Sequence, residues 1–219
     1  VGLRFADRHA LVRQVGQAGD EIVDAFEQPR QGLLAGFQLV AELRHFGHDR
    51  AGILALICAQ RTTVAVSGTH GKTSTTAMLA TLLAGAGADP SYLVGATPVG
   101  LGRAARWGLG GTGAFVVEAD ESDGTFLQLG AEVAVTTNVD EDHLVHWGDI
   151  EAIEAAFTRF ASSARTAIVC TDDPGSSADS GARARRVAAA SGAVTVGEAD
   201  DADLHLQDVE VDRLTTRFG

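Results

Sequence analysis

The stretch VAVSGTHGKTSTT, from Val64 to Thr76, decides how the rest of the chain is organised. The apolar run over residues 63–66 predicts a buried strand of a parallel sheet. A loop with two glycines follows, and the run that begins at Lys72 predicts a helix through about Gly85. The apolar stripe of this helix would consist of Met78, Leu79, Leu82 and Leu83.

A strand, a glycine loop and a helix in this order favour a nucleotide site, because the loop N–H groups and the helix N-terminus face an anion. Lys72 would reach the β- and γ-phosphates, and Thr73 would offer its hydroxyl to Mg²⁺. The common phosphate-loop pattern has a glycine five residues before Gly71, where this chain has Val66, so the loop is a shorter variant that starts at Gly68. A generic glycine-rich turn is the alternative interpretation, and Gly-Lys-Thr at the strand-to-helix junction argues against it.

The composition is that of an ordinary globular enzyme. The chain has 219 residues, of which 45% are hydrophobic and 21% charged, which suggests one or two domains. A net charge of -12 argues against general nucleic-acid binding, because a phosphate backbone would be repelled. Cys58 and Cys170 are isolated and have no metal-ligand spacing, which favours a reducing cytoplasm. No run of about 18 apolar residues and no signal-peptide pattern occurs, so we expect neither membrane insertion nor export.

Strands alternate with helices along the chain, which predicts an α/β fold with a doubly wound, mostly parallel sheet. A short, mostly helical segment precedes it, and its last helix would run from Asp49, as the cap, to Arg61. The glycine-rich region 95–113, with Arg103, Arg106 and Trp107, is predicted as a loop or broken hairpin beside the site. Further strands are expected at 91–94, 114–119, 132–137, 166–171 and 193–196, helices at 150–163 and 180–190, a turn at 172–175, and edge strands within 202–218.

Polar clusters follow two of the expected strands. Glu118 and Asp120 come after one strand, and Asn138, Asp142 and His143 come after the next. Ligands of such sheets lie at the carboxyl ends of the strands, so these groups are expected beside Lys72. A carboxylate there would complete a Mg²⁺ shell, and a histidine could serve a second cation. The alternatives are a solvated acidic turn and an ordinary histidine at a helix start.

Three motifs resemble those of the Mur ligases of peptidoglycan synthesis: GTHGKT at 68–73, EADESDG at 118–124 and TNVDEDHL at 137–144. Within that family they are most similar to members that join L-alanine to UDP-N-acetylmuramate. The resemblance implies that ATP phosphorylates the lactyl carboxylate and that the alanine amine attacks the acyl phosphate. It also implies that Lys72, Glu118 and His143 are catalytic, and that Thr73, Glu118 and His143 hold Mg²⁺. The implied nucleotide contacts are Gly68, Thr69, His70, Gly71, Lys72, Thr73, Ser74 and Asn138.

The chain also departs from the family pattern. Val145 stands where relatives have an aspartate after the histidine and leucine, and no Gly-x-His-Asn-x-x-Asn run for the adenine is found. We therefore expect residues 1–61 to be a remnant of an amino-terminal domain or a linker, and residues 62–219 to be a central ATP-binding domain that is incomplete at its carboxyl end. On its own, such a chain should bind ATP weakly and ligate little or no alanine.

Two other functions remain open at this point. One is another acid–amine ligase of the same superfamily, although folylpolyglutamate-type loops prefer asparagine where His70 stands. The murein-recycling tripeptide ligase is also possible, although it usually lacks the Ser-Asp-Gly that follows the acids here. The other is a nucleotide-binding remnant without catalysis.

Overall fold

The structure, a computed structural model, describes residues 50–108, 113–172, 179–212 and 215–217. The helices expected within residues 1–48, the cap Asp49 and most of the turn at 172–175 lie outside these ranges. Within them, no helix is both long enough and apolar enough to cross a membrane.

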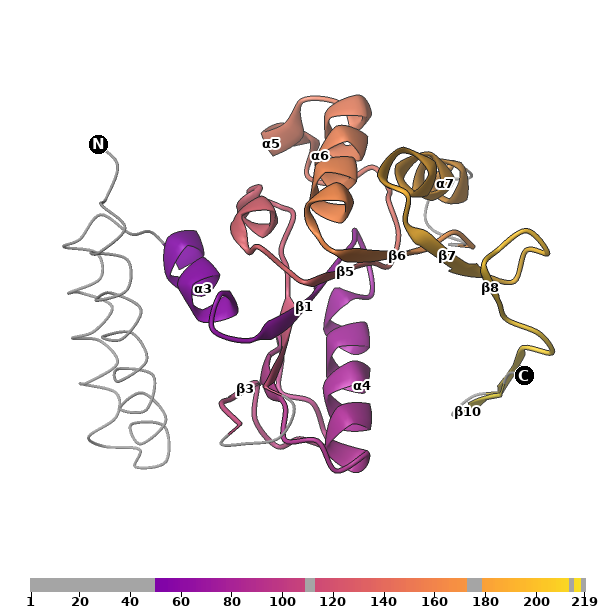
Figure 1. The fold of residues 1–219 in the computed structure, drawn as a ribbon. Helices are drawn as coiled ribbons and strands as arrows, with labels where there is room; N and C mark the ends of the chain where they lie inside the picture. The colour runs from indigo at the N-terminus through magenta and orange to yellow at the C-terminus, as the bar shows by residue number, and fades with distance from the viewer. Residues whose placement is uncertain (1–49, 109–112, 173–178, 213–214, 218–219) are drawn as a thin grey trace, which may run out of the picture.

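The described residues form an eight-stranded, mostly parallel sheet with helices on both faces (Figure 1). The strand order is β3-β2-β4-β1-β5-β6-β7-β8, and only the edge strand β3 is antiparallel to its neighbour. A separate antiparallel pair, β9 and β10, follows. The strands are β1 Thr62–Ser67, β2 Ser91–Leu93, β3 Ala105–Arg106, β4 Ala114–Glu118, β5 Val133–Thr136, β6 Thr166–Cys170, β7 Val194–Gly197, β8 Leu204–His205, β9 Glu210–Asp212 and β10 Thr215–Arg217.

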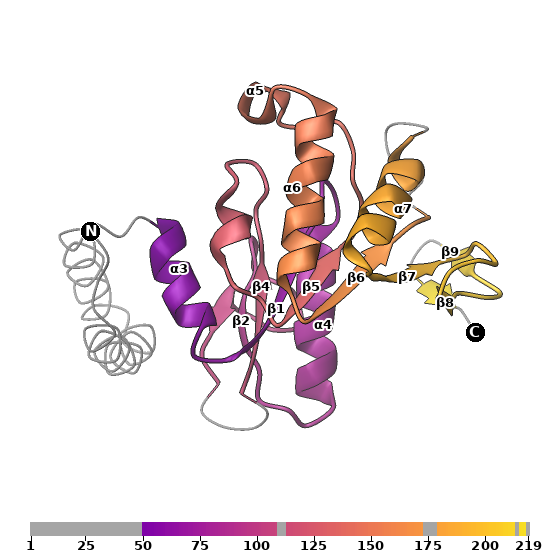
Figure 2. The ribbon, with the colours of Figure 1, turned by 45° about the horizontal axis from the view of Figure 1, so that its top comes forward.

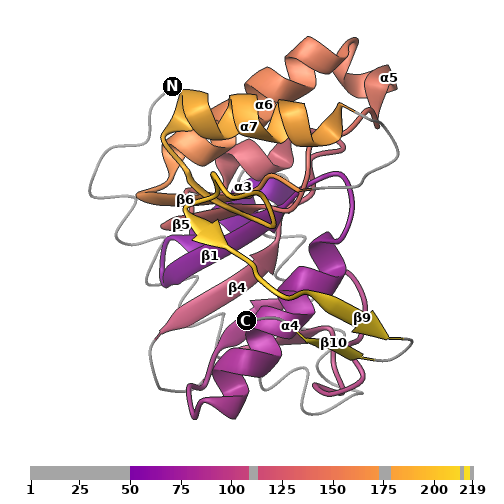
Figure 3. The ribbon, with the colours of Figure 1, turned by 90° about the vertical axis from the view of Figure 1, so that its right-hand side faces the viewer.

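Helices cover the two faces of the sheet unequally. Figures 2 and 3 show α6 and α7 together on one face and α4 on the other. The larger core lies under α6 and α7 and contains Phe126, Phe157 and Phe160, whereas the smaller core joins α4 to β2 and β4 through Ala80, Tyr92 and Val116. The helices are α3 Arg50–Cys58, α4 Lys72–Gly85, η1 Thr125–Gln128 (a 3₁₀ turn), α5 Leu144–Trp147, α6 Ile150–Ser163 and α7 Ser180–Ser191.

The predicted doubly wound sheet is therefore confirmed, and most predicted elements agree with the structure to within one or two residues. The helix expected from Asp49 to Arg61 ends earlier, at Cys58, because the chain turns there and Thr63 Oγ1 donates a hydrogen bond to the Cys58 carbonyl oxygen. The region 95–113 contributes β3, the short antiparallel partner of β2, so the broken-hairpin prediction is confirmed.

The predicted apolar stripe of α4 is wrong in part. Met78 is 59% exposed and Leu82 70% exposed, whereas Thr76 and Ala80 are fully buried. The helix approaches β1, β2 and β4 through these small residues, so only one flank of the leucine-rich surface packs on the sheet.

The two cysteines test how α3 packs on the larger core, because Cys58 is the last residue of that helix. Cys58 is 1% exposed, and burial raises the pKa of its thiol from 9.0 to about 11, whereas Cys170 is half-buried. At pH 8 we expect Cys170 to be alkylated at least about tenfold faster than Cys58 in the folded chain. The pKa of Cys58 is higher in the folded chain than in the unfolded chain. The free energy of unfolding should therefore decline as the pH rises above about 9.

Peptide mass spectrometry after timed alkylation measures both rates, and the chain in urea, where the two thiols should react alike, is the control. Equal rates in the folded chain would contradict the described packing of α3.

Candidate functional site

The loop between β1 and α4 depends on two glycines with positive φ. Gly68 has φ +136° and Gly71 has φ +82°, values that residues with a side chain rarely adopt. A Cβ on Gly68 would lie 2.0 Å from Thr137 Oγ1, so only glycine fits there. Gly71 is the N-cap of α4, and the N–H groups of the first helical turn have no acceptors within the helix. This arrangement suits an anion at the start of α4.

The segment after β5 braces this loop. Asn138 Oδ1 accepts a hydrogen bond from the His70 N–H at 2.8 Å, and Asn138 Nδ2 donates to the His70 carbonyl at 2.9 Å. Thr69 Oγ1 accepts from the Asp140 N–H at 2.9 Å. Thr69 and Asn138 are each only 7% exposed. The structure thus places these two predicted nucleotide contacts in the framework of the loop, where they fix the course of its backbone.

Thr73 and Glu118 meet although 45 residues separate them. Thr73 Oγ1 donates to Glu118 Oε1 at 2.9 Å, and the Gly95 N–H donates to Glu118 Oε2 at 2.6 Å. A Cβ on Gly95 would lie 2.8 Å from both carboxylate oxygens, so this position also requires glycine or a shift of Glu118. The pair presents hard oxygen ligands at the first turn of α4, which is the donor type that Mg²⁺ prefers.

Lys72 is folded back onto the loop. Its Nζ donates to the Gly68 carbonyl at 2.8 Å, to the Thr69 carbonyl at 3.3 Å and to Glu121 Oε1 at 2.8 Å. Glu121 is 3% exposed, and this burial raises the pKa of its carboxyl while the neighbouring Lys72 lowers it. Sequence reasoning missed Glu121, because nothing in the run of four acids at 118–123 distinguishes the buried one from its solvated neighbours.

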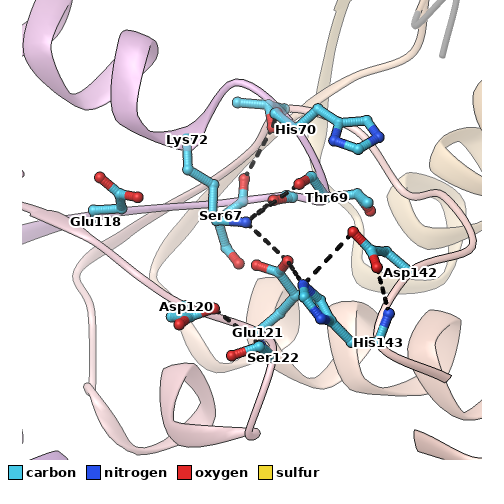
Figure 4. Close-up of polar contacts among 12 residues, drawn as sticks. Ser67, Thr69, His70, Lys72, Glu118, Asp120, Glu121, Ser122, Asp142 and His143 are labelled. Carbon is cyan, nitrogen blue, oxygen red and sulfur yellow. Dashed lines mark hydrogen bonds and ion pairs between the residues drawn. The ribbon is translucent and has the colours of Figure 1, made fainter. Parts of the chain in front are cut away.

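His143 lies on the far side of Glu121 from Lys72 (Figure 4). Its Nε2 is 3.7 Å from Glu121 Oε1 and 3.7 Å from Asp142 Oδ2, and its backbone is left-handed, with φ 55°. Trp147 Nε1 donates to the Glu121 carbonyl at 3.0 Å and so ties the end of α5 to the same turn. In the described part of the chain, no group of three His, Cys, Asp or Glu side chains could hold a metal ion. Metal binding here would therefore need oxygen ligands from Thr73, water and phosphate as well.

The remaining predicted neighbours are placed differently. Ser74 is exposed in the first turn of α4, and Val145 is fully exposed beside His143. Arg106 and Trp107 are not beside the site. Arg106 pairs with Asp89, and Trp107 packs against Phe115 and under the Arg61 guanidinium, at the amino ends of β1 and β4. The chain passes Glu118 at Gly95 and then turns back along the strands. Its second half therefore reaches the amino ends of the strands, away from the phosphate loop.

Known proteins are similar to this chain in sequence. Residues 66–218 match the family model described as the Mur ligase middle domain. The UDP-N-acetylmuramate–L-alanine ligase of Thermobifida fusca is 44% identical over 175 residues, which are 77% of this chain and 35% of that protein. The chain spans only about a third of the length of such curated relatives.

Two solved structures are similar in fold. The UDP-N-acetylmuramate:L-alanyl-gamma-D-glutamyl-meso-diaminopimelate ligase from Neisseria meningitides has a TM-score of 0.61 at 20% identity, over 84% of this chain and 60% of that chain. The MurF ligase from Thermotoga maritima in complex with ADP has a TM-score of 0.56 at 22% identity, over 78% of this chain and 42% of that chain. The family match over residues 66–218 includes the phosphate loop and the carboxylate beside it. The chain therefore belongs to the Mur ligase family.

Proposed function

We propose that this chain is the ATP-binding part of a cytoplasmic ligase that joins L-alanine to UDP-N-acetylmuramate in peptidoglycan precursor synthesis. The observation that carries the proposal is the loop at 68–73, which holds Lys72 and Thr73 at the start of α4, next to Glu118. The 44% identical relative bears the name of this activity, and the MurF neighbour contains ADP.

The reaction needs positioning and charge neutralisation more than covalent help from the protein. A substrate carboxylate oxygen attacks the γ-phosphorus of ATP, which gives an acyl phosphate and ADP. The alanine amine then attacks the acyl carbon, loses a proton and expels inorganic phosphate. Lys72 and the N–H groups at the start of α4 would bind the phosphates, and His143 would lie where the transferred group passes.

The residues present suit a magnesium ion. Thr73 and Glu118 offer a hydroxyl and a carboxylate that already touch each other, and oxygen donors of this kind match the preference of Mg²⁺. A bound Mg²⁺ would neutralise charge on the phosphates. His143 would offer its ring nitrogen to a second cation.

Lys72 tests the nucleotide site. Lys72→Ala should weaken Mg·ATP binding at least about 100-fold in titration calorimetry, because charge-assisted hydrogen bonds to the phosphates are lost. Thr81→Ala, which changes an exposed hydroxyl two turns further along α4, is the matched control and should bind as the parent chain does. Equal affinity of the Lys72 variant and the parent would exclude this loop as the site.

Glu118 tests the magnesium assignment. Glu118→Gln keeps the shape but removes the charge, so we expect the gain in ADP affinity caused by Mg²⁺ to fall at least about tenfold, with no loss of metal-free affinity. Calorimetry with ADP in Mg²⁺ and in chelator measures both values. Glu132→Gln, an acid at the amino end of β5, should keep the full gain. An unchanged gain in the Glu118 variant would contradict the assignment.

The ligation itself can be assayed in a chimera. Because the chain matches about a third of the Thermobifida fusca relative, its aligned segment would replace the counterpart in that protein. With UDP-N-acetylmuramate, L-alanine, ATP and Mg²⁺, mass spectrometry should detect the amide, and the same chimera with Lys72→Ala should form none.

A chimera that binds Mg·ATP but ligates only a tripeptide, or nothing, would contradict the proposed activity. Omitting L-alanine controls for ATP hydrolysis without ligation.

A further inference from the structure

The ammonium group of Lys72 is already saturated with acceptors. It has three N–H donors, and three oxygens accept from it: two loop carbonyls and Glu121 Oε1. The Lys72 side chain is 15% exposed, so little water reaches it. Phosphate oxygens can therefore receive a hydrogen bond from Lys72 only if it leaves at least one of these acceptors.

Glu121 is the acceptor with the greatest electrostatic effect. Its side chain is 4% exposed and carries the charge that balances Lys72. Glu121 Oε2 is buried, and among the described residues it has no hydrogen-bond partner. A buried carboxylate that loses its only strong partner is costly, so the pair resists separation. His143 Nε2, 3.7 Å from Oε1, is a group that can donate to Glu121 once Lys72 has moved.

We propose that Glu121 is a positioning residue that holds Lys72 on the loop in the absence of nucleotide and that a polyphosphate must displace. This inference rests on the proposed function in one respect, that a nucleotide binds at this loop. Two consequences follow from the geometry. Glu121 lowers nucleotide affinity, because it competes for the ammonium and repels the phosphates, and it links the position of Lys72 to that of His143.

The first test is affinity. Glu121→Gln removes the charge at constant shape, and Mg·ATP should bind about three- to tenfold more tightly in titration calorimetry. Asp120→Asn removes the same charge from the exposed neighbouring residue and should change the affinity less than about twofold, since exposed charges are screened. In a Lys72→Met background, the gain from Glu121→Gln should be smaller than in the parent chain, because only the repulsion of the phosphates is removed and there is no ammonium to release.

The second test uses a property of this sequence, in which Lys72 is the only lysine. Protein labelled with ¹³C,¹⁵N-lysine gives a single set of side-chain signals, so no assignment is needed. Without nucleotide, the two Cε protons should be inequivalent in the parent chain and nearly averaged in the Glu121→Gln variant. Saturation of the parent chain with Mg·ATP should shift the same signals.

The outcomes separate the two proposals. If the parent chain does not bind Mg·ATP, the proposed function fails. Suppose that the parent chain binds Mg·ATP, but the Glu121→Gln variant binds it equally or more weakly and gives the same lysine signals as the parent chain. This inference alone is then overturned. Should circular dichroism show that the variant does not fold, the parent chain decides, because lysine signals that Mg·ATP leaves unchanged would also overturn it.

Discussion

The register of three parallel strands is the constraint on which the rest of the site depends. Val66 of β1 pairs with Glu118 at the end of β4, and Ser67 pairs with Thr136 at the end of β5. Because parallel strands finish at the same edge, the phosphate loop, the Glu118–Asp123 turn and the Thr137–His143 segment all start within one row. A shift of one residue in the pairing of β1 with β4 would carry Glu118 to the other face of the sheet and away from Thr73.

Close packing then determines the shape of the loop from outside. The loop touches the end of β5 so closely at Gly68 that a methyl group would overlap Thr137. Asn138 binds the loop backbone at His70, and the Asp140 N–H donates to the Thr69 hydroxyl. Asp140 is fully buried, and its carboxylate pairs with Arg183 of α7 at 3.3 Å. A series of contacts thus runs from Arg183 of α7 through Asp140 to Thr69 of the phosphate loop. A loop that is braced in this way loses little further conformational freedom when an anion binds.

Much of this could be predicted because the local signals agree with the fold. The runs that became β1, β4, β5 and β6 are apolar, buried strands, and α6 has an apolar stripe together with the cap Asp149, whose carboxylate accepts from Ala152 N–H. The pairing of Thr73 with Glu118 followed from the rule that ligands lie at strand carboxyl ends. The partial error in α4 arose because periodicity identifies an apolar stripe but not how much of the helix the sheet covers. Arg106 was misplaced because sequence does not reveal where a hairpin turns back.

Glu121 shows a further limit of prediction from sequence, since burial in a turn leaves no periodic signal. The same residue also determines the charge balance of the site. Acids surround the start of α4: Glu118 contacts Thr73, Glu121 contacts Lys72, and Asp142 lies near His143. The single lysine of a chain with net charge -12 is already neutralised by one of them.

A polyphosphate that enters this acidic site gains little from Lys72 until the ammonium leaves Glu121. Its charge must therefore be met first by the backbone N–H groups of the loop and by a cation that Glu118 and Thr73 can share. The acidic character of the site thus makes nucleotide binding depend on the metal, because the same carboxylates that would repel bare phosphates would attract the ion that accompanies them.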